Sequence, residues 1–348
     1  MTPPPGPVQP TMLDVAIAAG VSRATVSRVL QDRGRFSPES QIKVMQAVHH
    51  LGFVPNVLAS ELASPSSRVI GLLLRDASNP AYAALFVELA RAAHEHQLPL
   101  ISMTVHHDEG GKGQIAALRR MLGMRVAGLV VATGDVTSEQ LEPFHTSLPI
   151  LRAGRPETNS LLNAVSYDEV DNARIIAEHV LAMGHRSVVV ILPTTTLSYP
   201  EHVRGSTMIA VLMAAGCTVR ALDVTDTFDQ GASGAVDLAL SGSATAIMTT
   251  TDRRQMAVIR ELHARGLTAP HDMSVTGLDG LLPGLDLLGL TTVRLPVEAL
   301  AQRTMIVMSQ LIVGDRGPLV QEKLCGQLIV GATVAPPMPS RIDLRTNL

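Results

Sequence analysis

The chain has 348 residues, 46% of them hydrophobic, and a net charge of −3. This length exceeds one ordinary domain and is enough to bury a large core. No apolar run reaches the length of a membrane span, and the first ten residues lack the charged start and apolar stretch of a signal peptide, so residues 1–10 are predicted to be a disordered arm.

Residues 11–54 are predicted to form three short helices. Thr11 fits the cap of a capping box that opens the first helix, and Gly20 permits a tight turn after it. Ser22 can cap the second helix, and the third is expected at residues 37–51, with a proline in its first turn. A helix, a short glycine-containing turn and a second helix form the pattern of DNA-binding heads.

The second helix carries polar side chains that the core does not need. Arg23, Ala24 and Arg28 suit base edges, because arginine can bond guanine twice and alanine can touch a thymine methyl. Hydroxyl groups suit phosphates. The DNA-contact candidates of the head are therefore Thr11, Ser22, Arg23, Ala24, Thr25, Ser27 and Arg28. The alternative is an ordinary three-helix cap with solvated arginines.

The head resembles the lactose-repressor (LacI/GalR) family in five strings: L-D-V-A, A-G-V-S, A-T-V-S-R-V-L, S-P-E-S and L-G-F-V-P-N. The resemblance implies a transcriptional regulator, a repressor, that binds a palindromic operator in double-stranded DNA as a homodimer and responds to a small-molecule effector. It implies a cytoplasmic, nucleoid-associated protein and no membrane partner. Residues 11–51 carry five basic and three acidic side chains, so specific binding should depend on dimerisation.

Residues 55–67 are expected to form a hinge helix and linker, by the same resemblance. Asn56 and Leu62 are its DNA-contact candidates, with Leu62 inserting into the minor groove and kinking the duplex. Ser60 and Glu61 depart from the family, which usually has a basic and a small polar residue there. The expected result is weaker or more dimer-dependent binding. Leu62 could instead be a linker leucine that packs on the core.

Residues 68–337 alternate buried strands with helices, which predicts parallel sheets covered on both faces. The predicted strands are 69–74, 100–104, 128–132, 148–151, 188–192, 218–224, 244–249 and 273–277. The predicted helices are 82–95, 113–121, 138–145, 170–183, 203–215, 232–240, 254–265 and 297–313. Two successive sets indicate two subdomains, and the late helix must return to the first.

The predicted fold class is therefore an all-α helix-turn-helix head plus an α/β two-lobed body with parallel sheets, which resembles a periplasmic binding protein. This effector-binding and dimerisation domain would comprise residues 68–165 with 294–325 and residues 166–293 with 326–337. The tail, residues 338–348, has no heptads, so a dimer is favoured over a coiled-coil tetramer.

An effector is expected at the carboxyl ends of the strands, where a cleft would lie between the lobes. Carboxylates there suit hydroxyl or amine groups of a ligand. The effector-site candidates are Ser78, Asn79, Tyr82, Asp171, His202, Asp252 and Asp279. Each could instead be a helix cap or a loop turn.

Five positions depart from the sugar-binding members that the chain resembles. His202 stands where an arginine is usual, and Thr251 stands where an asparagine is usual. Leu278, Gly280 and Leu295 replace an aromatic residue, an aspartate and a glutamine. The cleft has lost polar ligating groups, which indicates a less polyhydroxylated effector or a degenerate pocket.

No catalytic or metal site and no cofactor are predicted. The chain has no nucleophile elbow or phosphate-binding loop, and its two cysteines are distant from each other. Its histidine pairs lack accompanying ligands. Two alternatives remain open: an α/β small-molecule-binding protein whose head mediates another interaction, and a regulator without a small-molecule effector.

Overall fold

The computed structural model describes residues 10–30, 34–54, 67–75, 77–104, 112–134, 136–157, 161–225, 230–314 and 317–337. It comprises two compact units, Met1–Ser67 and Arg68–Leu348, each considered by itself below. The predicted arm up to residue 9, the hinge with Asn56 and Leu62, and the tail lie outside the described residues.

The head is a three-helix unit. Helices α1, α2 and α3 span Met12–Ala19, Arg23–Leu30 and Pro38–Leu51. The predicted capping box at Thr11 is present, and Gly20 and Gly52 end α1 and α3 with left-handed backbones at φ 65° and 60°. Apolar side chains fill the space between the helices, and all but the last are small: Val15, Ala16, Ala19, Val26, Val29, Val44, Ala47 and Phe53.

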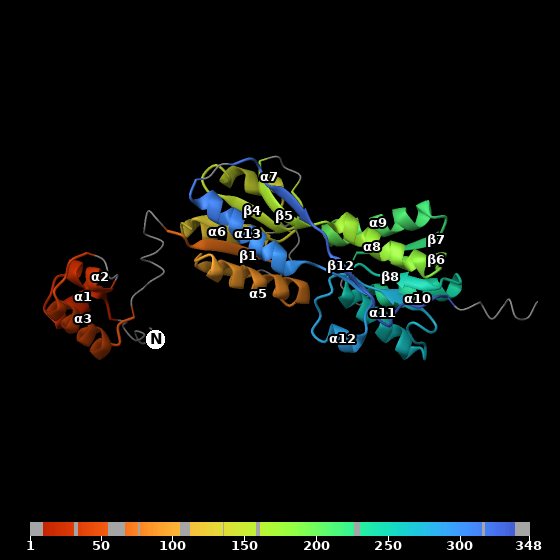
Figure 1. The fold of residues 1–348 in the computed structure, drawn as a ribbon, viewed down its shortest axis with the longest axis horizontal. Coiled ribbons are helices and arrows are strands. Elements are labelled where there is room, and N and C mark those ends of the chain that lie inside the picture. Colours follow the sequence, from red (N-terminus) through yellow and green to blue (C-terminus); the bar gives the residue numbers. More distant parts are fainter. Residues whose placement is uncertain are drawn as a thin grey trace, which may run out of the picture. The chain divides into compact units, whose positions relative to one another are not determined.

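The first lobe of the body is built on a six-stranded parallel sheet (Figure 1). The strand order is β11-β5-β4-β3-β1-β2. The strands are β1 (Ile70–Leu74), β2 (Leu100–Thr104), β3 (Gly128–Ala132), β4 (Ile150–Gly154), β5 (Asn163–Tyr167) and β11 (Gln321–Leu324). The helices of this lobe are α5 (Pro80–Glu95), α6 (Lys112–Gly123), α7 (Ser138–Leu141), the 3-10 turn Glu142–Phe144 and α13 (Val297–Ile312).

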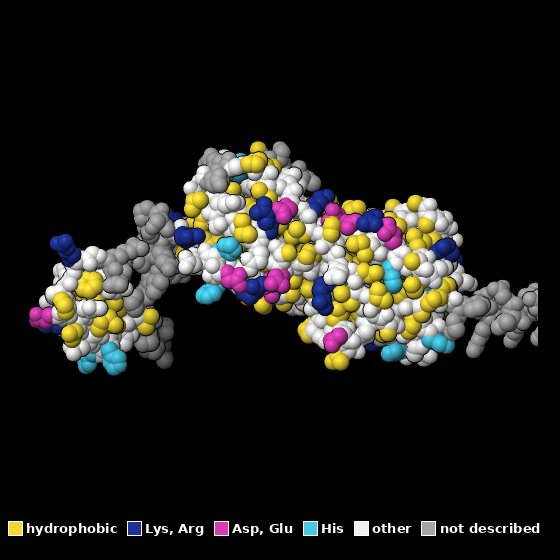
Figure 2. Space-filling view, in the orientation of Figure 1, with side chains coloured by type: hydrophobic (Ala, Val, Ile, Leu, Met, Phe, Trp, Pro, Cys, Tyr) yellow, Lys and Arg dark blue, Asp and Glu magenta, His cyan; other side chains and the backbone are white. Residues whose placement is uncertain are grey.

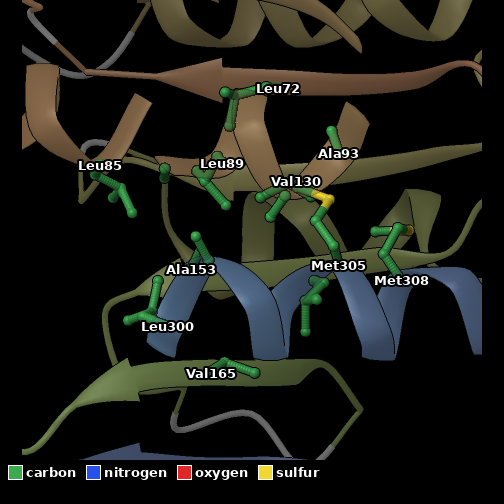
Figure 3. Packing of buried hydrophobic residues seen from close by; sticks show 14 of the residues in the cluster. Leu72, Leu85, Leu89, Ala93, Val130, Ala153, Val165, Leu300, Met305 and Met308 are labelled. Carbon is green, nitrogen blue, oxygen red and sulfur yellow. The ribbon is translucent and has the colours of Figure 1, made fainter. Parts of the chain in front are cut away.

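Helices α5 and α13 pack on this sheet and form its core (Figure 3). Leu89 from α5 and Met305 from α13 have no exposed surface, and neither do Leu72 and Val130 from the strands. Burial of each such side chain contributes about 1.5–3 kcal/mol. Segments more than 200 residues apart along the chain therefore share one core.

The second lobe has a four-stranded parallel sheet in the order β7-β6-β8-β9. Its strands are β6 (Ser187–Pro193), β7 (Thr218–Val224), β8 (Ala246–Met248) and β9 (Ser274–Thr276). Its helices are α8 (Glu169–Ala182), α9 (Tyr199–Ala214), α10 (Gln230–Ser241), α11 (Asp252–Ala264) and α12 (Leu285–Leu288). Strand β10 (Thr292–Arg294) pairs antiparallel with β12 (Gln327–Ile329).

The chain passes between the two lobes three times, from β5 to α8, from β10 to α13 and from β11 to β12 (Figure 1). In the last passage, β11 adds to β5 in the first sheet and β12 then pairs with β10. The two lobes are therefore connected, within the described residues, by three short segments that lie beside the ends of strands.

Some elements differ from the sequence prediction. Strand β5 was not predicted because Asn163 and Ser166 make it polar, yet it lies between β4 and β11 and is stabilised by pairing on both sides. The pair β10 and β12 and helix α12 were also missed. Helix α9 begins at Tyr199 rather than at residue 203, because Pro200 fits a first helical turn.

The surface of the body mixes acidic and basic side chains on the face in Figure 2. Arg91 pairs with Glu88, Glu95 and Glu298, which joins α5 to α13 at the surface. Within the described part of the chain, no helix is both long and apolar enough to span a membrane.

Candidate functional site

Helix α2 presents a polar face over the core of the head. Val26 and Val29 are buried on its inner side. Ser22, Arg23, Ala24 and Arg28 are exposed, whereas Thr25 and Ser27 are half-buried. The candidate base-contacting residues therefore share the solvent side of a helix that packing holds in place.

Several of these polar groups already bond within the head. The Ser22 hydroxyl accepts the Thr25 backbone N–H at 3.1 Å and lies 2.9 Å from the Thr25 hydroxyl, so it caps α2 as predicted. Arg28 donates from Nε to the Ala24 carbonyl at 3.2 Å and from Nη1 to the Arg35 carbonyl at 3.4 Å. Arg28 is thereby held against its own helix, whereas Arg23 forms no hydrogen bond with a described residue.

The body contains a cavity of about 240 Å³ between the carboxyl ends of the two sheets. Its walls come from the carboxyl ends of the strands, from the segments after them, and from helices α5, α8, α9 and α11. The first lobe contributes Arg75, Asn79, Ala81, Tyr82, Leu85, Ala132, Thr133, Gly134, Ala153, Gly154, Arg155, Tyr167 and Leu295. The second contributes Glu169, Leu197, Ser198, Pro200, Glu201, Arg204, Thr251, Arg253, Arg254 and Asp279.

Three of the seven effector-site candidates line this cavity: Asn79, Tyr82 and Asp279. Asn79 also accepts the Ala81 backbone N–H at 3.0 Å and so caps α5. Tyr82 packs against the first-lobe core. The structure thus brings Asp279 of the second lobe together with the start of α5 in the first lobe.

The candidates Ser78, Asp171 and His202 lie outside the cavity lining. Ser78 is exposed. Asp171 binds Arg174 on the surface of α8, which lowers the pKa of its carboxyl. The Nδ1 atom of His202 lies 2.9 Å from the Pro193 carbonyl oxygen, so this ring is fixed to the end of β6.

Asp252 is buried beside the cavity and stabilises the backbone. It accepts the Gly280 N–H at 2.7 Å and the Thr292 hydroxyl at 2.5 Å. Burial raises the pKa of Asp252 to about 6. It therefore joins the start of α11 to the segment after β9, and it does not line the cavity.

Arg204 is the centre of the charged network in the cavity. Its Nε and Nη2 donate to the Glu169 carboxylate at 2.6 and 3.0 Å, and its Nη1 donates to Asp279 at 2.8 Å. Only 5% of the Arg204 side chain and 13% of the Asp279 side chain are exposed. Burial raises the pKa of Asp279 to about 7, and the neighbouring carboxylates of Asp252 and Glu169 contribute to this rise.

The backbone at Asp279 is held in an unusual conformation. Its φ is 108°, although it has a side chain, and Gly280 follows at φ 64°. The Asp279 N–H donates to the Val293 carbonyl at 3.1 Å, and its carbonyl accepts from Leu295 at 2.9 Å. Such a conformation costs on the order of 1–3 kcal/mol and commonly marks a functional site.

A second ion pair of the cavity wall lies in the same lobe. Arg254 donates from Nε to Glu201 at 2.7 Å, and the same carboxylate oxygen accepts the Thr250 hydroxyl at 2.7 Å. The side chains of Arg254 and Glu201 are 2% and 9% exposed. Arg204 and Arg254 together bind the three carboxylates found among the described lining residues.

Two arginines of the first lobe contact the start of α9 in the second. The Arg155 guanidinium lies 4.7 Å from the centre of the Tyr199 ring, and its Nη1 donates to the Gly134 carbonyl at 2.6 Å. Arg75 donates to the Leu197 carbonyl at 3.3 Å. Burial, together with the charge of Arg152, lowers the pKa of Arg155.

The arginines and glutamates of the cavity were absent from the sequence-based candidates, although their positions carried a signal. Arg75 and Arg155 directly follow β1 and β4, and Glu169 lies two residues after β5. Arginines that directly follow a strand lie at the same edge of the sheets as the predicted candidates, so their positions also predict that they face the cavity.

No group of three or more metal-ligating side chains occurs within the described ranges. The polar groups of the cavity are arginines, carboxylates bound to arginines, and a few hydroxyl and amide groups. Such a set can bind and orient a small polar molecule.

The comparisons with known proteins cover both units. Residues 11–56 match the family described as bacterial regulatory proteins, lacI family, and residues 177–334 match a periplasmic binding protein-like domain. Catabolite control protein A from Priestia megaterium is 27% identical over 97% of this chain and 98% of its own length. The maltose regulon regulatory protein MalI from Escherichia coli (strain K12) is 34% identical over 51% of this chain and 52% of its own length.

Solved structures share the fold at lower identity. A lac repressor dimer bound to operator and an anti-inducer has a TM-score of 0.80 and 22% identity over 94% of this chain and all of its own. This similarity confirms the predicted fold class, a helix-turn-helix head with a two-lobed α/β body. The chain therefore belongs to the lactose-repressor (LacI/GalR) family of bacterial transcriptional regulators.

Proposed function

We propose that the protein is a transcriptional repressor that binds a palindromic operator as a homodimer and is controlled by a small metabolite in the interlobe cavity. The proposal rests on one observation: the chain combines an exposed polar face on α2 with a body that contains a cavity lined by charged side chains. The proposal includes no catalytic activity and a cytoplasmic location at the nucleoid.

On DNA, the first residues of α2 would contact base edges in the major groove, with two half-sites about one helical turn apart. Arg23 and Ala24 begin this helix and are exposed. Arg28 would have to exchange its bonds to the Ala24 and Arg35 carbonyls for a base or a phosphate. Ser22 and Thr25 are proposed as phosphate contacts, since hydroxyl groups commonly bond phosphates.

The hinge candidates Asn56 and Leu62 remain part of this proposal. By family resemblance, Leu62 of each subunit would enter the minor groove, and Glu61 beside it would repel phosphates. A ligand in the cavity can change DNA affinity only if it binds the DNA-competent arrangement of the lobes more tightly or less tightly than the alternative.

Footprinting of the full-length protein on the region upstream of its own gene and adjacent genes tests DNA recognition. We expect a protected palindrome that Arg23→Ala abolishes. The matched control is Lys43→Ala, which removes one positive charge from α3, where Lys43 pairs with exposed Glu39. No protected site at low salt, or equal losses in both variants, would contradict sequence-specific recognition.

A second candidate function is a regulator that responds to no small molecule. It is favoured by one observation: each carboxylate among the described lining residues of the cavity is already bound by Arg204 or Arg254. Thermal-shift measurements with a panel of metabolites distinguish the two functions, because a ligand that binds the folded state raises its Tm.

A further inference from the structure

The polar groups of the cavity are unevenly shared between its two lobes. Among the described residues that line it there are five arginines and three carboxylates, and all three of these carboxylates belong to the second lobe. Glu169 and Asp279 bind Arg204, and Glu201 binds Arg254. The negative charge that the described lining residues supply to this cavity is therefore already paired with arginines of the same lobe.

Arg155, on the opposite wall, is bonded to neutral groups. Its partners are the Gly134 carbonyl and the Tyr199 ring, and it forms no ion pair with a described carboxylate. The guanidinium is partly buried. A buried charge is costly unless it is paired, so an anion at this position would stabilise the site. A planar guanidinium also matches the two oxygens of a carboxylate or a phosphate.

Other groups near Arg155 favour negative charge. Arg75 and Arg155 contact Leu197 and Tyr199, two residues apart, so both cations approach one short segment of the second lobe. The 16-residue helix α9 begins at Tyr199, and the positive end of its dipole faces the same region. An oxyanion bound there would touch both lobes at once.

The rest of the cavity limits the ligand to a small molecule with an apolar part. Its volume of about 240 Å³ lies below the 300–1,000 Å³ that is usual for drug-sized ligands. Leu85 and Leu295 are among its apolar walls. We propose that the effector is a small organic anion whose carboxylate or phosphate group binds Arg155. This inference rests on the proposed function.

Calorimetric titration of the full-length protein tests this proposal with three probes that share a small apolar part and differ in charge: 1-butanol, butyrate and butyl phosphate. We expect butyrate or butyl phosphate to bind at least tenfold more tightly than 1-butanol, and the preferred anion separates a carboxylate source from a phosphate source. Inorganic phosphate, at ionic strength balanced with NaCl, should raise the Tm of the protein. These measurements on the unaltered chain do not require any variant to fold.

Arg155→Gln should weaken binding of the preferred anion at least tenfold, and Arg155→Lys should retain part of it. The control, Arg119→Gln, removes an exposed arginine from α6 in the same lobe and should leave binding unchanged. Equal or tighter binding of 1-butanol, no response to any anion, or equal losses in the Arg155 and Arg119 variants would overturn the proposal. Operator binding that persists in each case would show that only the ligand class was wrong.

Discussion

Replacing Arg204 with methionine should destabilise the body strongly and in a pH-dependent way. The arginine makes four hydrogen bonds: two to Glu169, one to Asp279 and one to the Thr250 carbonyl. Its removal leaves two carboxylates buried without their cation, which typically costs about 3–5 kcal/mol. We expect a loss of this size in the free energy of unfolding at pH 8.

The loss should be smaller at pH 5. Arg204 lowers the pKa of Asp279, so without Arg204 burial raises this pKa further above its unfolded value, and the folded variant holds a proton that the unfolded chain releases. Stability then falls as pH rises above about 4, by up to 1.4 kcal/mol per pH unit for each proton held. The deficit of Arg204→Met should accordingly shrink by about 1–2 kcal/mol from pH 8 to pH 5.

Urea unfolding followed by tyrosine fluorescence measures this effect in the body alone. The chain has no tryptophan, and its three tyrosines all lie in the body, at positions 82, 167 and 199. The control is Arg174→Met, because Arg174 is 45% exposed and such pairs contribute at most about 1 kcal/mol. A loss below 1 kcal/mol for Arg204→Met, or one of equal size at both pH values, would refute the reasoning.

Four further changes test other parts of the molecule. Arg28→Ala should cost about 1–3 kcal/mol of discrimination between operator and random DNA in a fluorescence-anisotropy titration; an equal loss on both DNAs would make Arg28 a phosphate contact. Gly280→Ala should lower the Tm by several degrees, because its Cβ would lie 2.4 Å from the Arg294 Cα; a Tm within 1 °C of the parent would contradict this close approach. Asp279→Asn should flatten the decline of stability between about pH 4 and pH 7, since the raised pKa of about 7 makes the folded state bind the extra proton; an unchanged pH profile would exclude Asp279 as its source. Glu61→Arg should tighten operator binding and steepen its salt dependence, whereas an unchanged slope would mean that residue 61 does not approach DNA.

The order of elements was predictable from the sequence because the strands of this body are short runs of apolar residues. Strands β2, β3 and β7 have the predicted bounds. Strand β5 escaped prediction, since Asn163 and Ser166 interrupt the apolar pattern and its strand conformation depends on β4 and on the distant β11. Strand pairing between residues so far apart in the sequence produces no local pattern from which the strand could be predicted.

The cavity was predictable in position but only partly in composition. The rule that ligands bind at strand carboxyl ends located Asp279. The same rule also predicted Asp252, but the Asp252 carboxylate accepts hydrogen bonds from Gly280 and Thr292 and does not line the cavity. Adjacent residues after a strand point in different directions, and only the packed structure decides which of them faces the cavity. Similarly, the ion pairs of Arg204 join three segments that the sequence keeps far apart.

The discontinuous first lobe has a consequence for how the protein is made. Its sheet and core are completed by α13 and β11, near the end of the chain. The second-lobe sheet, in contrast, lies in one uninterrupted stretch from β6 to β9. During synthesis on the ribosome, strands β1–β5 emerge first, and the edge of β5 stays unpaired until β11 has emerged, up to residue 324. We expect the second lobe to become compact first, and nascent chains that end before α13 to be the ones that need chaperones.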